Sequence, residues 1–237
     1  MDLLETGAAN LGVALDRVQL DQFRLYYGEL VQWNNYVNLT TVTDYEQVQT
    51  RHFLDSLTVD AVLPDTLRRS GRLLDVGSGA GLPGLPLRIA HPGLNVTLLD
   101  ATAKKTAFLK HITRVLGLKD VEICTGRAES LAHDQTLRGM YDVVVSRAVA
   151  RLSVLSELIL PFCKVGGLAV AQKRGNVAAE LCEAQVAIKS MGGVVKEVVD
   201  VEVEGVVDAA MLVVIEKTAA TMERYPRRPG IPSKHPL

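Results

Sequence analysis

The glycine-rich stretch LLDVGSGAGLPG, residues 73–84, constrains the fold of this chain more than any other feature. Its first residues are typical of a buried strand. The glycines Gly77, Gly79 and Gly81 then allow the backbone to turn tightly and to approach a ligand with no Cβ in between. Because an apolar, helix-like segment follows, the stretch predicts a strand, loop and helix that bind a nucleotide-like molecule.

The loop can be aligned with two motifs that imply different ligands. From Gly79 to Gly84 it has the G-x-G-x-x-G spacing of dinucleotide-binding loops, whereas from Gly77 it is G-x-G-x-G with Asp75 two residues upstream. A pyrophosphate would bind at the N-terminus of the helix that follows the loop, and the nearby carboxylate of Asp75 would repel it. S-adenosylmethionine carries cationic groups and no phosphate, so Asp75 favours this methyl donor over a nicotinamide dinucleotide.

From Arg72 onward the chain alternates strand-like and helix-like segments. The strand-like runs are residues 72–77, 95–100, 121–126, 141–148 and 167–173. This alternation predicts a parallel sheet covered on both faces by helices and joined by right-handed crossovers. Two further strand-like runs, residues 194–205 and 210–217, are separated only by a turn and predict a hairpin that adds an antiparallel strand.

The first 70 residues have a different pattern, which is helical. Apolar side chains recur at helical spacing at Phe23, Tyr27, Leu30 and Val37, in a segment that also holds the only tryptophan, Trp33. Residues 43–46, TDYE, have the form of a capping box, so we expect a further helix to begin there and to carry RHFLDSL, residues 51–57. Helices therefore precede the glycine loop.

Ligands of parallel sheets bind beyond the carboxyl ends of the strands. The candidate site therefore comprises the loop, Asp100, the residues from 126 to 129, and Ser146 with Arg147. Asp100 closes a strand about 20 residues after the loop, where a carboxylate suits hydrogen bonds to the two hydroxyls of a ribose.

Composition excludes several classes of protein. The 26 basic and 27 acidic residues give a net charge of -1, so a nucleic acid would have to be bound by a local patch. There is no apolar run of about 20 residues and no signal-like start, so we expect a cytoplasmic protein without a membrane contact. Cys124, Cys163 and Cys182 show no C-x-x-C spacing, so we expect reduced core residues and no metal site. No heptad pattern predicts self-assembly, and we expect a monomer.

The C-terminal segment RYPRRPGIPSKHPL is basic and rich in proline. Its prolines argue against regular structure. Its basic residues are Arg224, Arg227, Arg228, Lys234 and His235. Two interpretations stay open: a disordered, solvated tail, or a basic arm that reaches a phosphate backbone.

Several motifs carry a resemblance to a known family. They are NLTTVTDYEQVQTRHFLDSL, the glycine loop and the strand after it, GRAES, YDVVVSRAVARLSVLSELILPFCKVGGLAVAQKR and YPRRPGIPSKHPL. In order and spacing they resemble the bacterial small-subunit ribosomal RNA guanine-N7 methyltransferases, also called glucose-inhibited division protein B. The resemblance spans nearly the whole chain. RHFLDSL and SRAVA are specific to that family, whereas the loop alone is typical of methyltransferases in general.

The resemblance implies an α/β, Rossmann-like S-adenosylmethionine-dependent methyltransferase fold with a mostly parallel sheet of seven strands. The expected organisation is an N-terminal helical cap over residues 1–70, a methyltransferase domain over residues 71–219 and a basic tail over residues 220–237. The implied cofactor is S-adenosyl-L-methionine. The implied substrate is a guanine of small-subunit (16S) ribosomal RNA, with the small ribosomal subunit as a candidate partner.

The candidate cofactor-binding residues come from both arguments. The residues themselves indicate Gly77, Ser78, Gly79, Gly81 and Asp100. Carried over by position, the resemblance implies contacts of the donor with Gly77, Ala128, Glu129 and Arg147, which the strand ends also indicate, and it adds Leu82. Many members of the family have an aromatic residue where this chain has Leu82.

The candidate substrate-binding residues are Arg127, Arg147 and Lys173, which are expected to bind guanine O6 and flanking phosphates. Guanine N7 has a lone pair and no proton, so methyl transfer to it requires no general base. We therefore expect no catalytic acid–base residue, and catalysis by proximity and orientation.

The helix that carries RHFLDSL allows more than one interpretation. His52 is expected to be a packed or capping residue, and Arg51 and Asp55 have the spacing of an ordinary ion pair on one helix. The alternative is that this helix positions RNA or closes over the donor. Lys104 and Lys105 are expected to lie on a solvated helix face.

Competing functions are a methyltransferase for another RNA, a small molecule or a protein, a non-enzymatic nucleotide- or ribosome-binding module, and a nicotinamide oxidoreductase. The tail and the family-specific motifs disfavour the first, and the intact loop with Arg147 disfavours the second.

Overall fold

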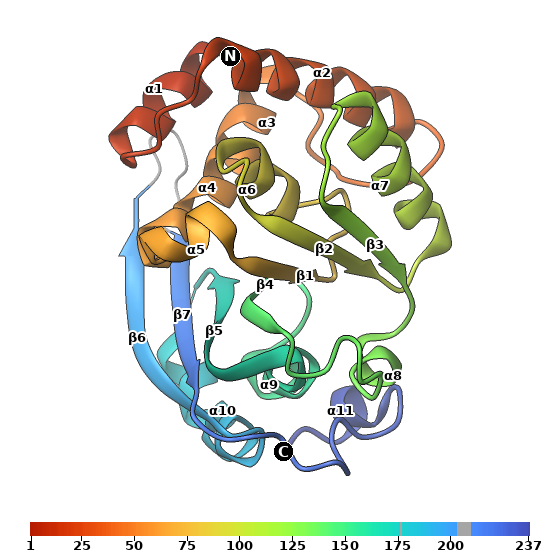
Figure 1. Ribbon diagram of the computed structural model, residues 1–237, viewed down its shortest axis with the longest axis vertical. Helices are drawn as coiled ribbons and strands as arrows, with labels where there is room; N and C mark the ends of the chain where they lie inside the picture. Colours follow the sequence, from red (N-terminus) through yellow and green to blue (C-terminus); the bar gives the residue numbers. More distant parts are fainter. Residues whose placement is uncertain (176, 203–209) are drawn as a thin grey trace.

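A central sheet of seven strands, in the order β3-β2-β1-β4-β5-β7-β6, organises the molecule (Figure 1). This computed structural model describes residues 1–175, 177–202 and 210–237. The strands are β1 (Arg72–Val76), β2 (Asn95–Asp100), β3 (Val121–Thr125), β4 (Tyr141–Arg147), β5 (Cys163–Lys173), β6 (Gly193–Val201) and β7 (Ala210–Lys217). The α/β, Rossmann-like architecture expected from the sequence is thereby confirmed.

Strands β1 to β5 pair in parallel, as their alternation with helices predicts. The expected hairpin is also present: β7 pairs antiparallel with β6 on one side and with β5 on the other. Strand β7 is therefore inserted inside the sheet, and β6 forms its edge. The turn expected between these strands, and the last three residues of the expected strand over 194–205, fall on residues 203–209, which lie outside the described residues.

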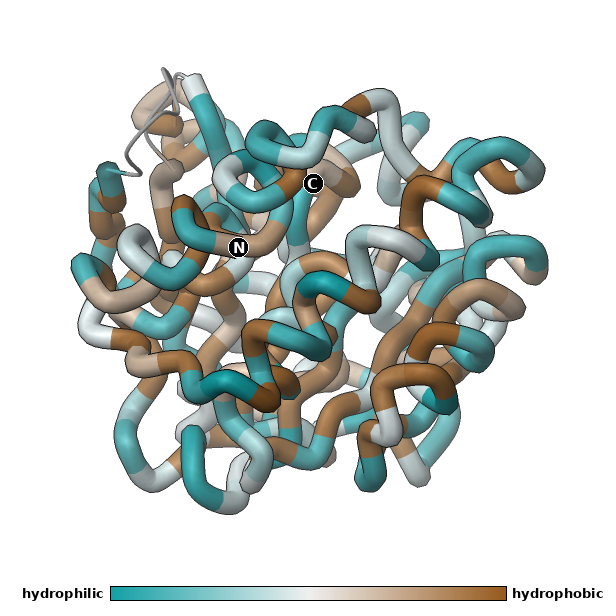
Figure 2. Tube along the Cα trace, turned by 90° about the horizontal axis from the view of Figure 1, so that it is seen from above, coloured by the Kyte–Doolittle hydropathy of each residue, from teal (hydrophilic) through white to brown (hydrophobic). Residues whose placement is uncertain are grey.

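Helices cover both faces of the sheet (Figure 1). One face is covered by α1 (Asp2–Asn10), α2 (Arg17–Asn34), α6 (Gly84–Ala90) and α7 (Ala103–Val115), and the other by α8 (Ala128–Leu131), α9 (Leu152–Ile159) and α10 (Val177–Ser190). Along β1, Leu73 belongs to the core shared with α2 and α6, whereas Leu74 belongs to the core shared with α9 and α10. Hydrophobic and hydrophilic stretches accordingly alternate along the chain (Figure 2).

The N-terminal helices connect to β1 through a series of short turns. These are α3 (Tyr45–Val48), a π-helical turn over Gln49–Leu54, α4 (Asp55–Leu57), a 3-10 turn over Thr58–Val62 and α5 (Asp65–Ser70). The N-cap of α3 lies one residue later than the capping box expected at residues 43–46. Asp44, the residue directly before the helix, caps α3 by accepting a hydrogen bond from the Gln47 amide at 3.0 Å.

The C-terminal segment packs against the domain, and the interpretation of a disordered, solvated tail is wrong. Arg227 donates hydrogen bonds from Nη2 and Nε to the buried carboxylate of Glu157, at 2.7 and 3.0 Å. A short helix, α11 (Ile231–Lys234), has proline in its first turn, where no amide hydrogen is needed, and Pro232 is buried. The buried carboxylate of Glu157 thus holds the C-terminal segment in place, although the composition of this segment is polar.

A candidate active site at the carboxyl edge of the sheet

The glycine loop between β1 and α6 needs its glycines for backbone conformation. Gly77, Gly79 and Gly81 have φ angles of 76°, 57° and 90°, in the region that side chains disfavour. Ser78 fastens the loop to β2, since its hydroxyl accepts a hydrogen bond from the Leu99 amide at 3.0 Å. The tight glycine turn after β1 is as the sequence predicts, and hydrogen bonds fasten it to β2.

Other atoms approach the loop backbone more closely at Gly77 than at Gly79. A Cβ on Gly79 would lie no closer than 3.8 Å to another heavy atom, so the backbone is open to a ligand there. A Cβ on Gly77 would lie 2.4 Å from the side chain of Val149. Val149 belongs to the family-specific SRAVA segment, which therefore lies directly against the loop.

Asp75 lies beneath the glycine loop and not on its surface, where the sequence argument places its charge. Its side chain is fully buried, and Oδ2 accepts a hydrogen bond from the Gly84 amide at 2.9 Å. Burial raises the pKa of Asp75 to about 7. Because the Gly84 amide at the start of α6 is already bonded to Asp75, this donor is not free to bind a pyrophosphate.

Asp100 ends β2 beside the open part of the loop. Its Oδ2 accepts a hydrogen bond from the Gly79 amide at 3.0 Å, and its Oδ1 accepts one from the Thr102 amide at 2.8 Å. A carboxylate offers about four acceptor positions, so further donors such as ribose hydroxyls can be accepted. The open backbone at Gly79 and this acceptor fit the nucleoside part of S-adenosylmethionine.

The segment after β3 joins the site to the C-terminal tail. Glu129 is buried, and its Oε1 accepts hydrogen bonds from Arg127 Nη2 at 2.8 Å and from the Gly230 amide at 3.1 Å. Burial acts to raise the pKa of Glu129, but these hydrogen bonds and the charge of Arg127 hold the pKa below its ordinary value. Ala128 lies beside it and is also buried. The hydrogen bond from Gly230 to Glu129 could not be predicted from the sequence, because it depends on how the tail packs.

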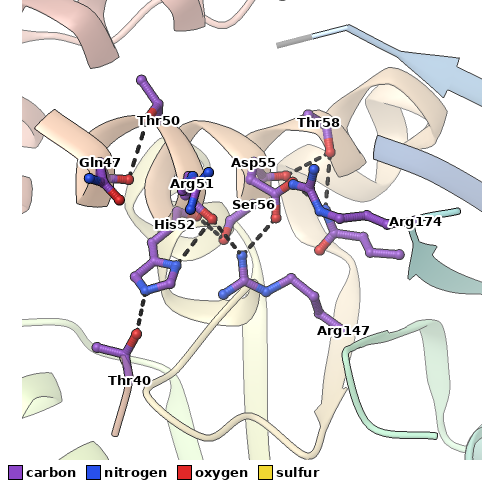
Figure 3. Close-up of polar contacts among 11 residues, drawn as sticks. Thr40, Gln47, Thr50, Arg51, His52, Asp55, Ser56, Thr58, Arg147 and Arg174 are labelled. Atoms are coloured by element: carbon purple, nitrogen blue, oxygen red, sulfur yellow. Dashed lines mark hydrogen bonds and ion pairs between the residues drawn. The ribbon is translucent and has the colours of Figure 1, made fainter. Parts of the chain in front are cut away.

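Arg147, at the end of β4, belongs to an internal cluster of charges (Figure 3). Its Nη1 donates to Asp55 Oδ2 at 2.7 Å and to the carbonyl of Arg51 at 3.2 Å. Arg174 pairs with the other oxygen of the same carboxylate. The expected Arg51–Asp55 ion pair is therefore wrong, since the Asp55 side chain turns inward to the two guanidinium groups from β4 and the end of β5.

His52 is packed and neutral, which agrees with the interpretation of a structural residue. Its Nε2 lies 2.7 Å from the hydroxyl of Thr40, and its Nδ1 lies 3.1 Å from the carbonyl of Arg51 (Figure 3). Burial, with the nearby charge of Arg147, lowers the pKa of His52 to about 4. The RHFLDSL segment is thereby tied to both the loop after α2 and the end of β4.

Lys173 ends β5, as the sequence predicts, and its ammonium group is bonded within the protein. Its Nζ lies 2.7 Å from Glu180 Oε2 and donates to the carbonyl of Ala150 at 2.8 Å. A contact between Lys173 and substrate stays a prediction. The preceding residue, Gln172, which sequence reasoning missed, donates from its side chain to the backbone carbonyl of Asp55 at 2.7 Å.

Other expectations concern the cysteines, metals and membranes. Cys163 is buried and Cys124 is half-buried, but Cys182 is exposed on α10, so its assignment to the core is wrong. Across residues 1–175, 177–202 and 210–237, no group of three or more metal-binding side chains is suitably placed. In the same part of the chain, no helix has the length and apolar character to cross a membrane.

Comparison with known proteins decides the family. The family model described as GidB, rRNA small subunit methyltransferase G, matches residues 19–207. The chain belongs to this family. A curated member from Dehalococcoides mccartyi (strain CBDB1), named ribosomal RNA small subunit methyltransferase G, is 49% identical over 100% of both chains. A member of the same name from Roseiflexus castenholzii is 48% identical, again over 100% of both chains. The protein is therefore an enzyme, a methyltransferase.

Solved structures agree with the fold. A ribosomal protein L11 methylase from Lactobacillus delbrueckii subsp. bulgaricus has a TM-score of 0.53 at 13% identity, covering 71% of this chain and 79% of its own. The antibiotic-resistance methyltransferase Kmr has a TM-score of 0.51 at 16% identity, covering 70% of this chain and 94% of its own. At these identities the likeness supports the Rossmann-like methyltransferase fold of the family and nothing further.

Proposed function

We propose that this methyltransferase transfers a methyl group from S-adenosylmethionine to N7 of a guanine in small-subunit (16S) ribosomal RNA in the cytoplasm. The observation that carries the proposal is the convergence of Gly79, Asp100, Glu129 and Arg147 at one edge of the sheet. Relatives that are similar over their full length are named for the small-subunit ribosomal RNA, which supports this choice of substrate.

The donor-binding residues in this proposal are those of the loop and of the neighbouring strand ends. Bound S-adenosylmethionine supplies a methyl group on a sulfonium that is ready for nucleophilic attack. Asp100 would accept the ribose hydroxyls, and the backbone of the loop, including Gly77, Ser78, Gly79 and Gly81, would lie against the nucleoside. The buried side chains of Leu82 and Ala128 offer apolar contact, and Glu129 fixes the segment after β3 in place.

The chemistry requires orientation rather than proton transfer. Guanine N7 attacks with a lone pair and loses no proton, so no base is needed. The titratable groups near the site are engaged: Asp55 and Glu129 are ion-paired, Asp75 is buried, and the low pKa of His52 keeps it neutral. This arrangement supports catalysis by holding the two reactants in line and excluding water.

The RNA-binding role rests on the cations of the same edge. The hydrogen bonds of Arg147 to Asp55 and Arg51 both use Nη1. They fix one side of the planar guanidinium group, which has five N–H donors in all. Donation to guanine O6 from another nitrogen would leave N7 free to react. The side chain of Arg127 is 55% exposed and would contact a flanking phosphate, with Lys173 as a further candidate.

The test is transfer of labelled methyl from S-adenosylmethionine to small subunits purified from cells that lack this protein. Wild type is expected to label the RNA, and Asp100→Asn is expected to bind the donor more weakly by calorimetry. Donor binding without transfer to subunits, free ribosomal RNA or assembly intermediates would contradict the proposed substrate. Absence of donor binding by wild type would contradict the cofactor as well.

A further inference from the structure

An exposed aromatic patch lies at the end of α2 and in the residues that follow it. Tyr36 is 81% exposed, and a cavity of about 390 Å³ is lined by Gln32, Trp33, Tyr36 and Val37. The patch, defined here as Trp33, Tyr36 and Val37, is fixed in place because the amides of Tyr36 and Val37 both donate to the Trp33 carbonyl at 2.9 Å. Exposed apolar surface beside polar groups is a common feature of binding sites.

The packing of α2 on α7 directs this patch toward the carboxyl edge of the sheet. The two helices run antiparallel, since Gln22 bonds to the carbonyl of Leu116 at 2.9 Å while the ring of Trp33 lies 5.6 Å from that of Phe108 (Figure 1). The end of α2 therefore approaches the beginning of α7, which starts three residues after Asp100. The patch thus lies on the side of the molecule where the candidate active site is.

The helix beside the patch is basic. Helix α7 carries Lys104, Lys105, Lys110 and Arg114 and has no acidic residue. Lys104 precedes Phe108 by four positions and so shares the face that packs near Trp33. None of the ion pairs found within the described part of the chain involves Lys104, and this side chain is exposed. From the sequence, Lys104 is expected on a solvated helix face, and that role alone does not explain the aromatic patch beside α7.

We propose that the patch and Lys104 bind an unpaired nucleotide of the RNA substrate, with the base stacked on Tyr36 and the phosphate at Lys104. This inference rests on the proposed function. In paired A-form RNA the deep, narrow major groove hides N7 of guanine, so the nucleotides around the target must be unpaired. Unpaired bases stack on aromatic side chains, while cations neutralise the backbone. A basic helix without acidic residues favours RNA over a protein as the occupant.

The test is binding of a fluorescent, unstructured oligoribonucleotide across a series of KCl concentrations. Tyr36→Ala is expected to weaken binding about 10-fold at every salt concentration, because stacking is not ionic, whereas Tyr36→Phe retains affinity. Lys104→Ala should reduce the slope of log affinity against log salt by about 0.7. The control is Val18→Ala, which removes an apolar side chain that is 68% exposed at the other end of α2, and no change is expected.

Methyl transfer to small subunits separates this inference from the proposed function. Tyr36→Ala should raise KM for subunits with little change in kcat, since the patch holds RNA away from the reacting atoms. If wild type transfers methyl but Tyr36→Ala binds the oligoribonucleotide as wild type does, the patch is not an RNA site. A defect seen with whole subunits and not with the oligoribonucleotide would indicate a protein contact and would also overturn the proposal. Failure of wild type to methylate counts against the proposed function itself.

Discussion

The side chain of Asp55 is 4% exposed and bonds two guanidinium groups, those of Arg147 and Arg174. Asp55→Asn removes the negative charge that pairs with both arginines. Removal of one partner from a buried ion pair costs about 3–5 kcal/mol of stability. We therefore expect Asp55→Asn to lower the free energy of unfolding by about 3 kcal/mol in urea. It should also abolish most methyl transfer, because Arg147 is no longer held.

The matched control for Asp55→Asn is Asp65→Asn. Asp65 also pairs with an arginine, Arg68, at 2.8 Å, but its side chain is 79% exposed. Exposed pairs contribute about 0–1 kcal/mol. Equal losses of stability in the two variants would contradict the account of the charge cluster.

Asp75 gives a prediction about pH. Burial raises the pKa of Asp75 from 3.8 to about 7, so the unfolded chain releases this proton at a lower pH than the folded protein. Between these two values the folded state binds more protons, and this group therefore lowers stability as pH rises toward about 7. Asp75→Asn should lose less stability between pH 5 and pH 8 than wild type in urea unfolding. An unchanged pH dependence would show that Asp75 ionises normally.

For single residues, the sequence predicts the place in the fold better than it predicts which side chain the residue bonds to. Arg147 ends β4 as expected, because the continuous apolar run of this strand can be recognised locally in the sequence. Its partner Asp55 lies 92 positions away in the chain, and only the packing of α4 against the strand ends brings the two together. The same reason explains the error at Asp75, whose burial depends on how α6 closes over the loop.

The C-terminal tail is the element whose structure differs most from the expectation. Arg227 reaches the carboxylate of Glu157, which is only 1% exposed, so Arg227→Ala leaves a buried charge unpaired. We expect Arg227→Ala to lower Tm by several degrees in a calorimetric scan. The exposed neighbour Arg228 serves as the control, and Arg228→Ala should melt as wild type does. Identical melting of both variants would mean that the tail is not held by this pair.

Elements defined by local periodicity were predictable, and those defined by distant contacts were not. The strands β1 to β5 and their helices follow from the alternation of short apolar runs with helix-like segments. The insertion of β7 between β5 and β6, the π-helical turn over Gln49–Leu54 and the docking of α11 depend on surfaces that form only after the sheet has assembled. The exposure of Tyr36 is also a property of the assembled structure and could not be predicted from the sequence.

At the scale of the whole molecule, the N-terminal helices and one face of the sheet share a single core. Phe23, Tyr26 and Leu30 of α2 are fully buried in the same cluster as Leu73 and Val143 of the sheet. Two-state unfolding is expected when segments share a core. The fluorescence of Trp33, the only tryptophan, and far-UV circular dichroism should therefore report the same midpoint in urea. An earlier transition by fluorescence would mean that the N-terminal helices unfold independently.

The central claim is that this fold holds a guanine so that N7 attacks the donor. The most direct measurement treats small-subunit RNA with the enzyme and S-adenosylmethionine and then cleaves the RNA chemically at N7-methylguanine. The account predicts one new cleavage site in RNA treated with wild type, and almost none with Arg147→Ala. Label incorporated into the RNA without a cleavage site would place the methyl group on another atom and would contradict the account.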